Sequence, residues 1–147
     1  MRLTFLGTGT SSGVPMIGCE CAVCTSDDPR DKRLRSSVLI EVDGKTILID
    51  AGPDLRQQLL RARVKTIDAV LLTHEHIDHI AGIDELRAFN FFQKKPMPLY
   101  GSERTLAAVK RMYAYAFEKE KYPGTPELEL RVISNAPFVA EDISVTP

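Results

Sequence analysis

Residues 67–79 read IDAVLLTHEHIDH, and this stretch decides how the rest of the sequence is interpreted. Its first half is aliphatic and predicts a buried strand. The polar second half contains every histidine of the chain, His74, His76 and His79, together with Asp78. Apolar residues then recur at helical spacing, so the cluster lies between a strand and a helix. In an α/β fold such a junction lies at the carboxyl edge of the sheet, where sites are generally built.

The side chains of this cluster are typical metal ligands. Imidazole nitrogens together with a carboxylate oxygen suit Zn²⁺, Mn²⁺ or Fe²⁺. His74 and His76 are two apart in an extended segment and can point the same way, while Asp78 and His79 adjoin the start of the helix. The positive end of a helix dipole keeps a nearby imidazole neutral, as metal binding requires. The alternative is a hydrophilic loop without a metal, which three histidines and an aspartate within six positions disfavour.

Around this cluster the pattern alternates strands and helices. An Asp43-Gly44 pair between two β-branched runs predicts a tight hairpin, because both turn residues must accept a positive φ. The sequence therefore predicts an α/β fold with a mixed sheet flanked by helices. Strands are expected at residues 2–6, 37–42, 46–50, 67–73, 98–101, 128–133 and 143–145, and helices at about 53–63, 79–96 and 102–117.

The three cysteines form a second cluster. Cys19, Cys21 and Cys24 lie inside residues 10–35, a stretch without clear periodicity that predicts a long ordered loop. An odd number of cysteines excludes a fully paired internal disulfide framework, and clustered thiols in a reducing compartment indicate metal ligands. Three free surface thiols, or a labile redox site, remain the alternatives.

Length and composition limit the classes of function. The chain has 147 residues, a net charge of −1 and 44% hydrophobic residues, which is enough for one domain with a core. The lack of a basic excess argues against a nucleic-acid partner. No apolar run approaches the roughly 20 residues of a membrane span, and the opening MRLTFLGTGTSSG lacks the apolar stretch of a signal peptide. We therefore expect no membrane partner and a cytoplasmic location.

The histidine cluster resembles the H-x-H-x-D-H signature of the metallo-β-lactamase superfamily. Further segments resemble its PhnP-like phosphodiesterase branch, namely FLGTGT at 5–10, GTSSGVP at 9–15, GCECAVC at 18–24, RLRSS at 33–37 and ILIDAG at 47–52. This resemblance implies half of an αββα sandwich. It implies that residues 1–147 are the N-terminal part of one domain whose C-terminal half is absent from this chain.

The resemblance also implies a role for each residue of the site. His74 and His76 would hold one divalent ion, and Asp78 and His79 a second, with zinc or manganese as the metals. Asp50 would lie beneath the site as a hydrogen-bond partner that ties the strand end to the histidine loop, although it could equally form a turn. Asp78 would also orient the attacking water. The implied reaction is metal-assisted hydrolysis by a hydroxide that the two ions share.

The substrate implied by the resemblance is a small cyclic phosphate or a related phosphodiester. A tRNA 3′-processing endonuclease is the alternative within the same chemistry. A non-catalytic metal-binding fragment is the alternative outside it, because no histidine follows His79 and each ion would have only two ligands from this chain.

The absent half would complete two further features. By the same resemblance Cys19, Cys21 and Cys24 hold a structural zinc together with a histidine of that half. An apolar sheet face would also be left uncovered, so we expect association of the isolated chain, for example as a homodimer, through that face.

Overall fold

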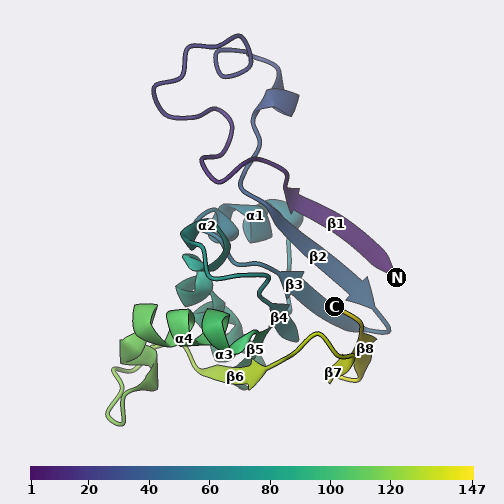
Figure 1. Cartoon of the computed structure of the whole chain (residues 1–147), viewed down its shortest axis with the longest axis vertical. Helices are drawn as coiled ribbons and strands as arrows, with labels where there is room; N and C mark the ends of the chain where they lie inside the picture. The colour runs from purple at the N-terminus through teal and green to yellow at the C-terminus, as the bar shows by residue number, and fades with distance from the viewer.

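A computed structural model describes residues 1–147 and confirms the mixed α/β architecture (Figure 1). One sheet has the order β1-β2-β3-β4-β5-β6. The first three strands are antiparallel, with Asp43-Gly44 as the predicted turn, and the strands from β3 onward are parallel. The six strands are β1 (Arg2–Gly7), β2 (Ser37–Val42), β3 (Lys45–Ile49), β4 (Ala69–Leu71), β5 (Met97–Gly101) and β6 (Leu128–Val132).

The helices pack on one face of this sheet and form the main core with it. In that core Leu48 of β3 and Leu99 of β5 contact a cluster that includes Leu55 and Leu106, and all four side chains are buried. Ser102 caps α4 by accepting a hydrogen bond from the Thr105 N–H, as the sequence predicts. The helices are α1 (Leu55–Ala62), α2 (Ile77–Ile80), α3 (Arg87–Gln93) and α4 (Glu103–Met112), with 3₁₀ turns at Pro29–Asp31, Ile83–Leu86 and Ala114–Phe117.

The prediction of one continuous helix over residues 79–96 is wrong. The segment is divided into α2, a 3₁₀ turn and α3. The break occurs at Gly82, whose backbone N–H donates to the carbonyl of Ala51 at 2.7 Å. Tertiary packing against the loop after β3 therefore replaces helix continuity at this point.

A second hairpin, of which the sequence indicated only one strand, covers part of the other sheet face. It consists of β7 (Phe138–Ala140) and β8 (Ile143–Val145), each of three residues. Ala140 packs on Ala69 and on Tyr100 of the sheet. Strand β7 is too short to show the alternation that identifies a strand. At β1 the same face stays open, because Phe5 is 66% exposed.

The segment between β1 and β2 extends away from the sheet as a long loop (Figure 1). It contains no strand, in agreement with the prediction. Its base is fixed by backbone bridges from Gly9 to Arg35 and from Val14 to Arg33, and by an Arg35–Asp54 ion pair of 3.0 Å. None of the helices has the length and apolar content needed to cross a membrane.

Candidate metal centre

The histidine loop and Asp50 meet because β3 and β4 are parallel neighbours. Asp50 directly follows β3, and the loop with the histidines follows β4, so both leave the sheet at its carboxyl edge. The Asp50 N–H donates to the Leu71 carbonyl at 3.0 Å, which continues the pairing one residue beyond the strand. Two segments more than twenty residues apart in the sequence thus form one site.

Asp50 is the most buried carboxylate of this site, with 4% of its surface exposed. Its φ of 60° is left-handed, so the chain turns sharply at the end of β3. Its Oδ1 accepts the Thr73 N–H at 2.8 Å, and its Oδ2 accepts the Thr73 hydroxyl at 2.8 Å. The same Oδ2 lies 2.7 Å from His79 Nδ1. The carboxylate therefore ties the strand end to the histidine loop, the contact expected for Asp50.

These hydrogen bonds select the tautomers of two histidines. An ionised carboxylate only accepts, so His79 Nδ1 carries the proton that faces Asp50. The Thr73 hydroxyl gives its single proton to Asp50 and can only accept from His74 Nδ1, which lies 3.0 Å away. In the neutral form of each ring, which metal binding requires, the Nε2 lone pair is then left for another partner. A carboxylate behind a histidine is the usual support of a metal-binding imidazole.

The remaining predicted ligands gather around these two rings. His79 Nε2 lies 3.2 Å from Asp78 Oδ2, a separation that two ligands of one ion can share. The His74 ring centroid is 4.6 Å from that of His76 and 4.0 Å from that of His79. The neutral nitrogens and the carboxylate oxygen present here are a donor set that fits a divalent ion such as zinc.

The four ligand atoms do not form one compact cage. The only cluster of three or more ligand atoms that all lie within 4.8 Å of one another is the cysteine cluster. His74, His76, Asp78 and His79 therefore approach one another in pairs rather than as a closed set.

Two glycines position the loop, a role that sequence reasoning did not identify. A Cβ on Gly52 would lie 2.1 Å from the Asp78 carbonyl oxygen, and a Cβ on Gly82 would lie 2.1 Å from the Gly52 carbonyl oxygen. The Ala51 N–H also donates to the His79 carbonyl at 2.7 Å. The backbone after β3 and the backbone of α2 thus touch directly. The supporting role of Thr73 was also not predicted. The one signal for it in the sequence is its position between the strand and the first histidine.

Glu75, between His74 and His76 in the sequence, connects the loop to α4. Its carboxylate forms an ion pair of 2.5 Å with Arg104. The pKa of Glu75 lies below its ordinary value because its own backbone N–H and the Arg104 guanidinium stabilise the charged form. The loop is therefore connected to two helices, α2 and α4.

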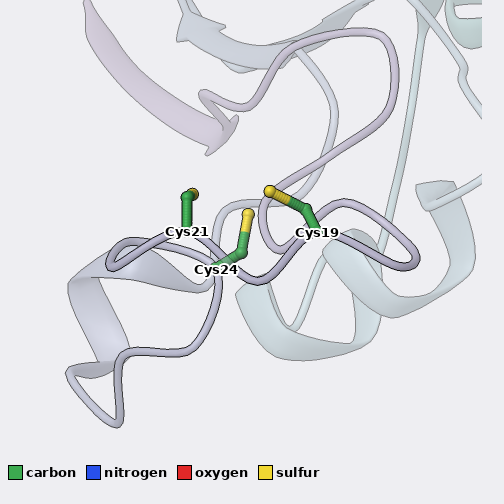
Figure 2. Close-up of side chains that lie close together, drawn as sticks. All are labelled: Cys19, Cys21 and Cys24. Atoms are coloured by element: carbon green, nitrogen blue, oxygen red, sulfur yellow. The ribbon is translucent and has the colours of Figure 1, made fainter.

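The three cysteine thiols converge in the long loop (Figure 2). The Sγ atoms of Cys19, Cys21 and Cys24 all lie within 4.8 Å of one another. The backbone N–H of Met16 donates to Cys24 Sγ at 3.4 Å. Hydrogen bonds from the Cys24 backbone and from the neighbouring thiols lower the pKa of Cys21 to about 7. Three thiols with this geometry and an accessible thiolate fit a tetrahedral zinc that lacks one ligand.

Comparison with known proteins supports the same family. The model of the beta-lactamase superfamily domain matches residues 45–147. The chain belongs to the metallo-β-lactamase superfamily. Within this superfamily it is similar to a diphosphatase from the PhnP family, with 44% identity and a TM-score of 0.84 over 93% of this chain and 52% of that one. It also resembles Zn²⁺-bound PqqB from Methylobacterium extorquens, with 29% identity and a TM-score of 0.77 over 99% and 51% of the two chains.

These superfamily relatives are longer than the chain. A protein of Porphyromonas gingivalis (strain ATCC BAA-308 / W83) named octanoyltransferase is 48% identical over 100% of this chain, but the match covers only 30% of that protein. The chain spans about half the length of the two solved structures. The similarity confirms the resemblance to the PhnP branch of the superfamily.

Proposed function

We propose that the protein containing this chain is a metal-dependent hydrolase of phosphodiesters, such as a cyclic phosphate. The observation that carries the proposal is the pair of histidines whose Nδ1 protons are fixed by Asp50, directly for His79 and through Thr73 for His74. This support leaves both Nε2 atoms free to bind a metal. A buried carboxylate with this geometry is not needed in a loop that only turns the chain.

Each loop residue has a part in this proposal. His74 and His76 would hold one ion, and Asp78 and His79 the other, with further ligands from the rest of the protein. Zinc or manganese, when bound, supplies Lewis-acid activation of water and of a phosphoryl oxygen. Asp50 keeps the His79 ring oriented and its Nδ1 protonated. Asp78 also offers an oxygen that can accept a hydrogen bond from the attacking water.

A second candidate reaction is hydrolysis of a diphosphate linkage. The 44% identical member of the PhnP family is described as a diphosphatase, and this supports a P–O bond as the target in either case. We place the protein in the cytoplasm, because a reducing compartment keeps the three thiols available.

The test uses the full-length protein with added Mn²⁺ or Zn²⁺. Bis-p-nitrophenyl phosphate, a dinucleotide with a diphosphate bridge and a tRNA precursor are compared as substrates. We expect hydrolysis of bis-p-nitrophenyl phosphate and no cleavage of the tRNA precursor. Turnover of the bridged dinucleotide alone would favour the diphosphatase, and cleavage of the tRNA alone would favour the endonuclease. If the metal-loaded protein hydrolyses none of these substrates, the proposal is contradicted and a non-catalytic module is favoured.

Replacing Thr73 by Val is expected to weaken metal binding about tenfold in the full-length protein. Valine has nearly the same shape but cannot accept from His74 Nδ1 or donate to Asp50. Thr73→Ser keeps the hydroxyl and should restore the affinity. The measurement is competition for zinc with a chromophoric chelator. Equal affinities of the valine and serine variants would show that the hydroxyl has no role.

We further propose that Cys19, Cys21 and Cys24 hold one structural zinc, with a fourth ligand from the rest of the protein. Cys21→Ser should therefore lower the zinc content of the full-length protein by about one ion per chain, since a Zn–thiolate bond is lost. Elemental analysis after dialysis measures this loss. An unchanged zinc content would exclude the structural site.

The open part of the sheet face at β1 remains the surface through which we propose that an isolated 147-residue chain associates. Leu3 and Phe5 are 49% and 66% exposed there. Exposed apolar side chains on an edge strand favour pairing with another chain.

A further inference from the structure

An apolar groove on the helical side of the fold lies outside the candidate metal centre. It has a volume of about 610 Å³ and runs between α1, with the turn after it, and the segment that ends in α3. Buried Leu59 and Phe89 of the core form its floor. Leu60 and Phe92 line it as well, although they are 61% and 77% exposed. Large apolar side chains exposed around one hollow are typical of an interaction surface.

The two walls have the spacing of helix-packing surfaces. On one wall Arg56, Leu60 and Arg63 follow one another at intervals of four and three residues. On the other wall Glu85 lies in the 3₁₀ turn Ile83–Leu86 and Phe92 lies in α3, with further lining residues between them. Rows of this kind on two neighbouring helical segments leave a groove that can receive a third helix.

The charges around the groove favour a negatively charged partner. Arg56, Arg63 and Lys65 line it, against a single acidic residue, Glu85. None of these four side chains takes part in the ion pairs of the fold. The groove is therefore locally positive in a chain whose net charge is −1. A second copy of the chain would bring a second set of uncompensated cations, whereas an acidic partner would neutralise them.

We propose that this groove binds an amphipathic helix of another protein, with apolar side chains at helical spacing and aspartate or glutamate on its flanks. The apolar side chains enter the hollow between Leu60 and Phe92. The carboxylates of the partner pair with Arg56, Arg63 and Lys65. The site is separate from the proposed hydrolysis, since none of its residues belongs to the histidine loop.

The experiment uses full-length protein and two synthetic helical peptides with the same leucine stripe, one flanked by glutamates and the other by lysines. Fluorescence anisotropy measures binding of each. We expect saturable binding of the glutamate peptide, at least about tenfold tighter than that of the lysine peptide. Arg63→Glu and Leu60→Asp should each weaken it by a similar factor. Both positions are exposed, so the fold should tolerate the changes.

Lys110→Glu, an equivalent charge reversal on an exposed residue of α4 outside the groove, is the matched control and should leave binding unchanged. Equal binding of the two peptides, or loss of binding by the control as well, would overturn the proposal. Sedimentation of the same variants tests whether a second copy of the chain occupies the groove instead. Self-association that Leu60→Asp abolishes would assign the groove to a second copy and would also overturn it.

Discussion

Replacing His76 by Ala in the full-length protein is expected to lower the hydrolysis of bis-p-nitrophenyl phosphate by more than about 100-fold. Loss of a residue that only supports a ligand typically costs 10–100-fold in affinity or activity, so loss of a ligand itself should cost more. His76 is exposed and its side chain makes no capping hydrogen bond to α2, so the effect should fall on chemistry and not on folding.

The readouts for His76→Ala are the steady-state rate, the metal content and the unfolding curve. The rate and the metal content should fall while the unfolding midpoint stays close to that of the wild type. Ile77→Ala is the matched control, because Ile77 is the next residue in the sequence, at the start of α2, is 61% exposed and has no ligand atom. It should keep the metal content. A His76→Ala protein that hydrolyses the substrate at the wild-type rate would remove the metal role assigned to the loop.

Gly82→Ala is expected to destabilise the protein by about 3 kcal/mol. The new Cβ would lie 2.1 Å from the Gly52 carbonyl oxygen and 2.8 Å from Leu55 Cβ, so backbone as well as side chain would have to move. The displacement would also reach the histidine loop, since Gly52 contacts the Asp78 backbone. Chemical denaturation of the full-length protein should show a lower midpoint, and metal affinity should fall with it.

Gly101→Ala is the control for this substitution. Gly101 is also buried, but a Cβ there would meet its nearest atom, Leu106 Cδ2, at 3.4 Å, an ordinary contact. The free energy of unfolding of the Gly101→Ala protein should stay within about 1 kcal/mol of the wild-type value. If both alanine variants are equally stable, the close approach of Gly52 and Gly82 does not position the loop.

Much of the fold is predictable from local patterns. The Asp43-Gly44 hairpin and the Ser102 cap follow from turn and cap chemistry, which depends on neighbouring residues alone. The break at Gly82 does not, because a buried backbone contact with Ala51 competes with the helical hydrogen bond. Strand β7 is equally hidden in the sequence, since three residues carry too little alternation to be distinguished from a loop.

By itself the sequence determined the type of chemistry. Three histidines and Asp78 after an apolar strand, and three cysteines within six positions, are clustered side chains of the types that can bind metal, whatever the detailed fold. Only the tertiary structure decided how these side chains are held. The parallel pairing of β3 and β4 brings Asp50 to Thr73 and His79, and this long-range contact sets the tautomers that expose two Nε2 atoms. Hydrogen-bond partners from distant segments cannot be identified from residue spacing, because they depend on which strands become neighbours.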